Sequence, residues 1–297
     1  MRALITGSGG QVAHQLQLTK PAGATILALT RAQCDIGDRP AVVAAVDSFA
    51  PDVIINAAAY TNVDGAESDK ESAFRINRDG AANVAHAAGR ARARLVHIST
   101  DYVFDGHQST PYSPSARPAP LGVYGASKLA GEEAVLSSDV AVTVVRTGWV
   151  FAETGRNFVR TILRLLDSGK PLAVVSDQVG TPTYARDLAA FLWKCAELPP
   201  AEKLLHWANS GIASWYDLAV ASQELARERG ITDSETVIKP VRTADYHTAA
   251  QRPAYSVLDS SLAWNTYGVA RHWRSALAST LDNLAAQGVP SSHTGNA

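Results

Sequence analysis

Short runs of apolar, β-branched residues alternate with alanine-rich amphipathic stretches through the first half of the chain. Strands that are apolar nearly throughout are typical of a parallel sheet covered on both faces. The pattern predicts strands at residues 3–6, 25–29, 53–56, 94–98 and 141–146, and helices at residues 11–18, 39–49, 68–89 and 124–136. With right-handed crossovers, these elements form an α/β fold built on a doubly wound, Rossmann-like parallel sheet.

The second half of the chain is less regular. Its periodicity predicts helices at residues 157–167, 184–197, 214–229 and 272–286, and short strands at residues 172–175 and 204–207. Since no linker separates the halves, we expect a dinucleotide-binding domain at residues 1–150 and a smaller, interleaved α/β substrate-binding region at residues 151–290. Part of that region returns to the first sheet, and a tail follows at residues 291–297. Residues 105–123, rich in proline and serine, predict a long functional loop that forms a wall of the substrate pocket.

Composition adds limits on partners and location. The 297 residues are 46% hydrophobic and 19% charged, as in an ordinary globular protein, and the net charge of −1 gives no reason to expect nucleic acid or an acidic membrane as partner. The first strand-like run is too short for a signal peptide or a spanning helix, so we expect a cytoplasmic location. Cys34 and Cys195 are expected to be free thiols, and since no histidine stands in a metal-ligand spacing we assign no metal.

A glycine-rich segment, Gly7-Ser8-Gly9-Gly10-Gln11-Val12-Ala13, follows the first strand and opens the first helix. Gly7 permits a tight turn, and Gly10 lets the backbone approach a pyrophosphate at the helix N-terminus. A pattern of this kind alone is weak, but further βα units follow it. We therefore assign Gly7, Gly10, Gln11 and Val12 to a dinucleotide site.

The end of the second strand indicates which dinucleotide binds. An acidic residue usually meets the unphosphorylated ribose there, but here the strand ends in Thr30-Arg31 and the first carboxylate is Asp35. The Arg31 guanidinium could pair with a 2′-phosphate, although it could also be simply solvated. We predict NADPH, with NADH as a possible substitute, and assign Arg31, Asp35 and Ile36 to this end of the site.

Small residues follow the third strand, in the run Asn56-Ala57-Ala58-Ala59-Tyr60-Thr61. Three successive alanines suit a backbone that lies against a flat ligand, or alternatively a close helix contact. We assign Ala57, Ala58, Ala59 and Thr61 to the cofactor site.

A hydroxyl, a phenol and an ammonium form the candidate catalytic group. Tyr124 and Lys128 stand four residues apart on a predicted helix and so share a face. An ammonium beside the phenol is expected to lower the tyrosine pKa and make it a usable proton donor or acceptor. Thr100, at the end of the fourth strand, is expected to approach the same point.

These residues resemble the extended short-chain dehydrogenase/reductase family and, within it, the dTDP-4-dehydrorhamnose reductases. The resemblance covers essentially the whole chain. Its most specific carriers are Ser99-Thr100-Asp101-Tyr102-Val103-Phe104-Asp105-Gly106 and Asp177-Gln178-Val179-Gly180-Thr181-Pro182-Thr183, beside residues 7–13, 56–61, 63–68, 124–132, 146–151, 214–215 and 252–253.

The resemblance implies that NAD(P)H reduces the C4 keto group of dTDP-4-dehydro-L-rhamnose to give dTDP-L-rhamnose. This reaction would belong to the biosynthesis of rhamnose for cell-surface polysaccharide. It implies that Tyr124 supplies the proton, that Lys128 tunes Tyr124 and holds the nicotinamide ribose, and that Thr100 polarises the carbonyl or adjusts proton transfer. It implies substrate contacts for Thr100, Asp101, Tyr102, Trp149, Asn157 and Arg252. The aromatic residues could instead belong to the core, and Arg252 could be part of a surface ion pair.

The chain departs from the family pattern at the first helix. Some of these reductases carry a glutamate there that helps to bind a divalent metal at a dimer interface, and the corresponding position is Gln15. An amide lacks the charge that a hard cation prefers, so a metal role is doubtful. The apolar faces of residues 63–86 and 124–136 are compatible with a homodimer or with burial inside one subunit.

Two alternatives stay open. A sugar-nucleotide dehydratase on this scaffold needs an acid pair after the threonine, but Asp101 is followed by Tyr102, and an epimerase retains NAD. A non-catalytic NADP-binding regulatory subunit would not need both Tyr124 and Lys128.

Overall fold

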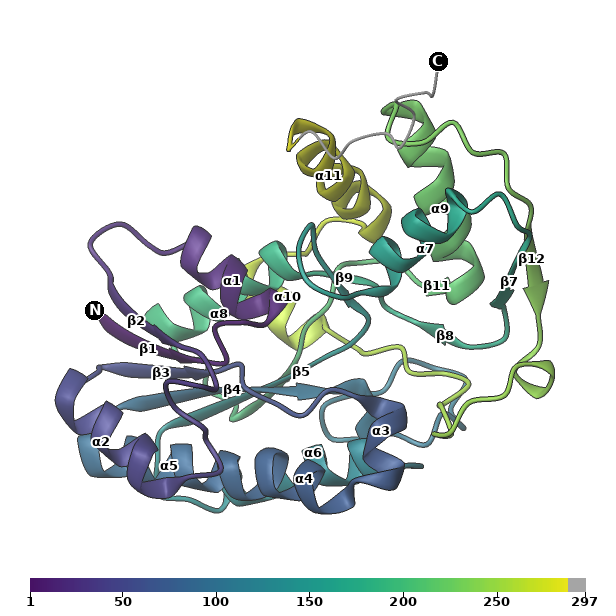
Figure 1. Cartoon of the computed structure of the whole chain (residues 1–297). Coiled ribbons are helices and arrows are strands. Elements are labelled where there is room, and N and C mark those ends of the chain that lie inside the picture. Colours follow the sequence, from purple (N-terminus) through teal and green to yellow (C-terminus); the bar gives the residue numbers. More distant parts are fainter. Residues whose placement is uncertain (288–297) are drawn as a thin grey trace.

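A parallel six-stranded sheet forms the centre of the larger lobe in the computed structural model, which describes residues 1–287 (Figure 1). Its strands are β1 (Arg2–Thr6), β2 (Thr25–Leu29), β3 (Val53–Asn56), β4 (Arg94–Thr100), β5 (Val142–Thr147) and β10 (Leu204–His206). They lie in the order β10-β5-β4-β3-β1-β2, with every neighbouring pair parallel. The direction of winding reverses between β1 and β3, which places a ligand crevice at their carboxyl ends. The predicted doubly wound fold is confirmed.

Helices cover both faces of this sheet. One face packs against α2 (Arg39–Phe49), α5 (Ala81–Ala91) and α6 (Val123–Leu136), and the other against α1 (Gln11–Leu18), α8 (Ala185–Glu197) and α10 (Ser261–Tyr267) (Figure 1). Successive side chains of β1 show the alternation, because Leu4 enters the first core and Ile5 the second. This double burial explains why the strands are apolar throughout.

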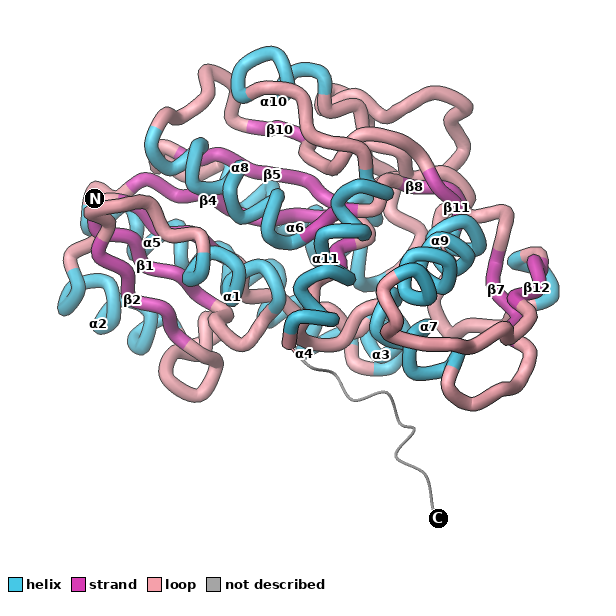
Figure 2. The backbone as a smooth tube through the Cα atoms, turned by 90° about the horizontal axis from the view of Figure 1, so that it is seen from above, coloured by secondary structure: helices cyan, strands magenta, loops and turns pink. Residues whose placement is uncertain are grey.

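A smaller lobe lies beside the carboxyl ends of the strands. Its apolar cores are formed largely by the helices α7 (Phe158–Leu166), α9 (Trp215–Glu228) and α11 (Trp273–Ala286), which lie close together (Figure 2). Short strand pairs complete it: β7 (Leu172–Val175) with β12 (Ile238–Val241), β6 (Val150–Phe151) with β9 (Thr183–Tyr184), and β8 (Val179–Gly180) with β11 (Ala213–Ser214). The domain boundary at residue 150 stays a prediction, and the expected tail at residues 291–297 lies outside the described residues.

The helix expected at residues 68–89 is confirmed as a continuous helical stretch over residues 70–91, made of α4 (Lys70–Phe74), a π-helical turn η1 (Arg75–Gly80) and α5. A separate short helix that was not foreseen, α3 (Val63–Ser68), precedes it. Asp69 separates α3 from α4, and its side chain accepts a hydrogen bond from the Ser72 amide and caps α4. The π turn carries Asn77, which accepts from the Tyr60 amide at 2.8 Å and donates to Ser127 Oγ at 2.9 Å. The irregular turn thus ties the end of β3 to α6.

The other predicted helices and strands agree with the structure to within two residues. The elements that the sequence analysis missed are short: β6, β8, β9 and β11 have two residues each, and β12, α10 and the 3-10 turns η2 (Asp101–Val103) and η3 (Thr243–Asp245) were also not foreseen. Two-residue strands carry no periodicity and arise from long-range pairing. Cys34 and Cys195 are buried and free, as expected. Within residues 1–287, no helix is long and apolar enough to cross a membrane.

The loop at residues 105–123 does not form the wall that we expected, because the main cleft takes no lining residue from 105–121. The loop instead packs against the chain near residue 255. Tyr112 is buried, donates its hydroxyl to Asp105 Oδ1 at 2.8 Å and pairs in a β-bridge with Leu258. Gly106 has a φ of +81° and lies against Pro253. The loop therefore packs against residues 253–258 and does not line the main cleft.

Candidate active site

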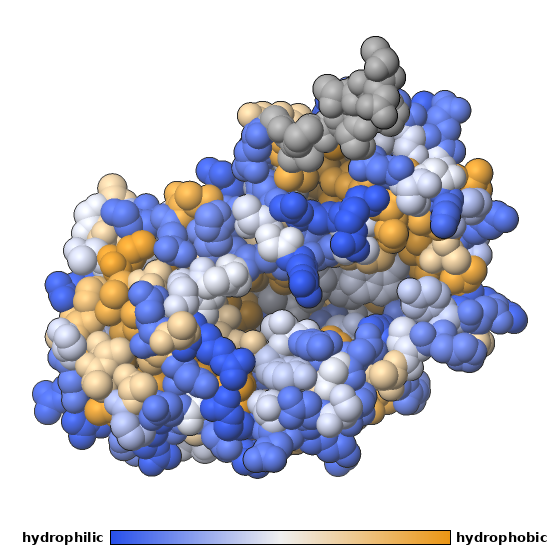
Figure 3. Space-filling model, viewed as in Figure 1, coloured by the Kyte–Doolittle hydropathy of each residue, from blue (hydrophilic) through white to orange (hydrophobic). Residues whose placement is uncertain are grey.

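A cleft opens between the carboxyl ends of β1, β3, β4 and β5 and the smaller lobe, and Figure 3 shows this face hollowed there. Its volume is about 640 Å³. The glycine-rich turn, the alanine run, the ends of β4 and β5, α6 and the first residues of α7 and α9 all line it. The two halves of the chain thus meet at one site.

The glycine-rich turn leaves the start of α1 open. Gly7 has a φ of +72°, and a Cβ there would lie 2.7 Å from the Ala58 backbone, so only glycine fits. Gly10 is the N-cap of α1 without a side-chain cap, and the first turn of the helix carries no acidic residue. The first N–H groups of α1 are therefore left for an anion, which the helix dipole also favours.

A second cavity of about 280 Å³ continues from this turn. The residues that line it include Gly7, Thr30, Arg31, Asp35, Ile36 and the alanine run 57–59. Two arginines form ion pairs with Asp35 Oδ2: Arg75 through Nη2 at 3.1 Å and the largely exposed Arg31 through Nε at 3.7 Å. Burial favours the neutral acid, but hydrogen bonds from the Gly37 amide and from Arg75 outweigh it and hold the pKa of Asp35 below its usual value. Arg31 thus remains the exposed cation at the end predicted to hold a 2′-phosphate.

The structure brings Thr100, Tyr124 and Lys128 to the same wall of the cleft. Lys128 is buried on α6 and its Nζ donates to the Ile98 carbonyl of β4 at 2.7 Å. Burial lowers the pKa of Lys128 to about 8. Burial also raises the pKa of Tyr124 to about 12, against the opposing effect of a hydrogen bond with Thr100. The expected lowering of the Tyr124 pKa by Lys128 is not found, since burial dominates, and the phenol is protonated at neutral pH.

A buried ion pair fixes this wall. Glu132, on α6, accepts three hydrogen bonds from Arg146 of β5, one from Nη2 at 2.6 Å and two from Nε at 2.9 and 3.1 Å, and it also accepts from the Ser99 hydroxyl of β4. Both charged side chains are buried, 3% and 1% exposed for Arg146 and Glu132. Together with the Ser99 hydrogen bond, the pair joins α6 to β4 and β5, the two strands that carry the site.

Asp101 and Tyr102 lie next to Thr100 and Tyr124. Asp101 is buried, accepts from Ser256 Oγ at 2.6 Å and from Thr100 Oγ1 at 3.1 Å, and has a pKa raised by burial to about 6. Tyr102 lies edge-on to Tyr124 with ring centroids 5.7 Å apart. Asp101 and Tyr102, both expected at the substrate, therefore line the cleft beside the candidate catalytic group.

Trp149 forms an aromatic wall with Trp215, which the sequence analysis quoted in a motif but did not assign to the site. The two rings stack with centroids 3.4 Å apart and an interplanar angle of 1°. Trp149 has a φ of +51°, and a Cβ on Gly180 would lie 2.5 Å from its ring. The Gly180 of the second specific motif is thus required by the indole. Trp149 is a wall of the cleft and not a core residue.

Arg252 and Asn157, both expected at the substrate, make contacts within the protein. Arg252 pairs with Asp64 at 2.7 Å, as the alternative interpretation had it, and also contacts Tyr102. It lines a third cavity of about 520 Å³, which shares Tyr102, Phe158 and Trp215 with the main cleft. Asn157 caps α7 and donates to Gln11 Oε1 and the Ala152 carbonyl, each at 2.8 Å, and it does not line the cleft. Its side chain is therefore committed to structure.

Gln15, the position that the family resemblance connects with a metal, is buried on α1. Its Nε2 donates to Glu153 Oε2 at 2.9 Å. Over the described part of the chain, no three acidic, histidine or cysteine residues come together as a metal site. An amide that is already bonded to a carboxylate is a poor ligand for a hard cation, so the residues do not fit a metal here.

Comparison with known proteins places the chain among sugar-nucleotide reductases. A family model described as the RmlD substrate binding domain matches residues 1–286. The dTDP-4-dehydrorhamnose reductase of Mycobacterium tuberculosis is 43% identical over 94% of this chain and 92% of its own. A probable dTDP-4,6-dihydroxy-2-methyloxan-3-one 4-ketoreductase of Streptomyces antibioticus is 38% identical over the full length of both.

A solved structure shows the same fold over nearly the whole chain. The dTDP-4-dehydrorhamnose reductase of Bacillus anthracis, crystallised in complex with NADP, superposes with a TM-score of 0.90 at 36% identity, covering 95% of this chain and 99% of that one. The family model covers residues 1–286, and the solved structure has the same fold. The chain therefore belongs to the RmlD substrate binding domain family.

Proposed function

We propose that this protein reduces the C4 keto group of dTDP-4-dehydro-L-rhamnose to give dTDP-L-rhamnose, with NADPH as the reductant. The observation that carries the proposal is the meeting of Thr100, Tyr124 and Lys128 at a cleft that begins at an open helix N-terminus. The names of the two relatives described above each specify a dTDP-linked keto sugar as substrate.

The donor set fits a dinucleotide. The uncapped start of α1 would take the diphosphate, and the second cavity, with Arg31 at its edge, would take the adenosine 2′-phosphate. The alanine run lines both cavities and leaves room for flat groups. When bound, a reduced nicotinamide supplies the hydride.

The chain's own residues handle the proton. Tyr124, protonated because burial keeps its pKa near 12, donates its proton to the oxygen that develops charge at C4. Thr100 shares a hydrogen bond with Tyr124 and orients it toward the substrate oxygen. The Lys128 ammonium, held by the Ile98 carbonyl, stabilises the tyrosinate that remains.

The third cavity would hold the nucleotide end of the substrate. It opens from the main cleft past Tyr102 and Trp215, and Arg252 contributes the cation at its edge. A diphosphate there would leave the sugar between Tyr124 and the Trp149–Trp215 wall. Arg252 is therefore assigned to the substrate, with Asp64 as the residue that holds its guanidinium in place.

A second candidate is the reduction of a different dTDP-linked 4-keto sugar. The full-length similarity to the Streptomyces antibioticus 4-ketoreductase favours it, because that protein is named for another substrate. Dehydration fits less well, since Asp101 is already bonded to Ser256 and Thr100 and no carboxylate follows it.

The test is an NADPH oxidation assay with purified protein against several dTDP-linked 4-keto-6-deoxy sugars. The proposal predicts the highest kcat/KM with dTDP-4-dehydro-L-rhamnose. A preference of 10-fold or more for another member would favour the second candidate, and inactivity with all of them would contradict both.

We expect the enzyme to work in the cytoplasm. We also expect that any homodimer forms without a metal bridge, because Gln15 is committed to Glu153. Light scattering with and without a chelator tests this, and a dimer that dissociates on chelation would contradict it.

A further inference from the structure

Arg156 lines the main cleft beside the glycine-rich turn. It lines the same cleft as Gly9, Gly10 and Gln11, although it belongs to the segment that leads into α7. Its side chain is exposed, and among residues 1–287 its guanidinium forms neither an ion pair nor a hydrogen bond with the protein. An arginine so placed is a cation without a protein partner beside a predicted anion site.

The backbone that carries Arg156 is fixed against α1. Gln11 Nε2 donates to the Arg156 carbonyl at 3.4 Å, and Asn157 Nδ2 donates to Gln11 Oε1 at 2.8 Å. Gly155 has a φ of +74°, and a Cβ there would lie 2.9 Å from the Gln11 side chain. The turn therefore packs directly on the first residue of the helix.

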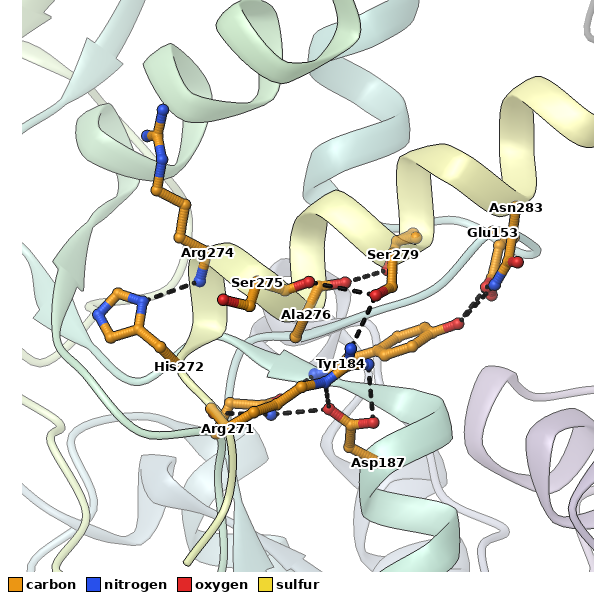
Figure 4. A network of polar contacts seen from close by, with 12 residues as sticks. Glu153, Tyr184, Asp187, Arg271, His272, Arg274, Ser275, Ala276, Ser279 and Asn283 are labelled. Carbon is orange, nitrogen blue, oxygen red and sulfur yellow. Dashed lines mark hydrogen bonds and ion pairs between the residues drawn. The ribbon is translucent and has the colours of Figure 1, made fainter. Parts of the chain in front are cut away.

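The other end of the segment is held by Glu153. Its buried carboxylate accepts from Gln15 Nε2 at 2.9 Å, from Asn283 Nδ2 at 2.7 Å and from the Tyr184 hydroxyl. Figure 4 shows Glu153, Tyr184 and Asn283 converging below α11. Both ends of the segment that runs from Glu153 to Asn157 are therefore held by hydrogen bonds, whereas the Arg156 side chain remains available for a ligand.

We propose that Arg156 binds the diphosphate of the dinucleotide from the smaller lobe, beside the N-terminus of α1. The inference rests on the proposed function. It assigns Arg156 to the cofactor and not to the substrate, because the substrate nucleotide is expected in the third cavity with Arg252, on the far side of Trp215. Planar guanidinium groups bind phosphate oxygens in pairs, which N–H groups of a helix terminus complement.

The test measures the dissociation constant of NADP⁺ by calorimetry, without sugar substrate. Arg156→Ala is expected to raise it about 10-fold, the loss of one charge-assisted hydrogen bond. Arg156→Lys should lose less, since it keeps the charge but not the fork. The difference from the wild type should shrink at high salt. Arg164→Ala, at an exposed arginine of α7 away from the cavities, is the matched control and should bind as the wild type does.

An unchanged dissociation constant in Arg156→Ala would overturn the proposal. So would a rise confined to the KM of the sugar nucleotide, which would assign Arg156 to the substrate diphosphate. Binding is measured without turnover, so the outcome stands apart from any failure of the proposed reaction. Equal melting temperatures of the variants establish that the change is local.

Discussion

Replacing Tyr124 with phenylalanine removes the proposed proton donor and little else. The hydroxyl has Thr100 as its side-chain hydrogen-bond partner, so the free energy of unfolding should fall by only about 1 kcal/mol. General acid catalysis contributes about 10²- to 10⁴-fold to rates, and we expect kcat to fall by that factor. The KM for NADPH should change little. Steady-state NADPH oxidation, with a melting curve for each protein, measures both effects.

Tyr102→Phe is the matched control. Its ring lies 5.7 Å from that of Tyr124, its hydroxyl contacts Arg252, and it is assigned no proton. We expect a higher KM for the sugar nucleotide and a kcat within about 10-fold of the wild type. If Tyr124→Phe kept its kcat within 10-fold, or if the two variants lost kcat equally, the assignment of the proton donor would be refuted.

Three further predictions follow from other parts of the site. Because burial lowers the pKa of Lys128 to about 8, its ammonium is lost as the pH rises through that value, and kcat should fall on the alkaline side; a rate that still rises at pH 9 would contradict this role. Arg31→Ala should raise the KM for NADPH about 10-fold and leave that for NADH unchanged, and an unaltered preference would remove Arg31 from the site. Glu132→Ala leaves Arg146 buried without its partner and should lower the free energy of unfolding by about 3–5 kcal/mol in urea denaturation, where a loss below 1 kcal/mol would refute the structural role of the pair.

Local sequence patterns were enough to predict the sheet and the meeting of Thr100, Tyr124 and Lys128 at one cleft. Double burial made β1 and β3–β5 apolar, and helical spacing alone put Tyr124 and Lys128 on one face. Long-range packing was not predictable in this way. Trp215 lines the cleft and stacks on Trp149, and the π turn carries Asn77, whose side-chain amide is hydrogen-bonded to Tyr60 and Ser127.

Electrostatics at the site also depended on burial. From spacing, Lys128 should lower the pKa of Tyr124, but the burial of Tyr124 raises that pKa instead. In the same way, Asn157 looked available as a polar residue at a helix start, yet Gln11 and the Ala152 carbonyl take its amide. Residue type indicated these candidates, and the tertiary contacts decided between them.

The central claim is that hydride passes from the reduced cofactor to C4 of the sugar nucleotide. The most direct measurement uses NADPH that carries deuterium at both hydrogen positions of the nicotinamide C4, with dTDP-4-dehydro-L-rhamnose as substrate, followed by NMR of the product. We predict one deuterium at C4 of the rhamnose unit for each NADPH consumed. Turnover without added NADPH, or product without deuterium at C4, would contradict it.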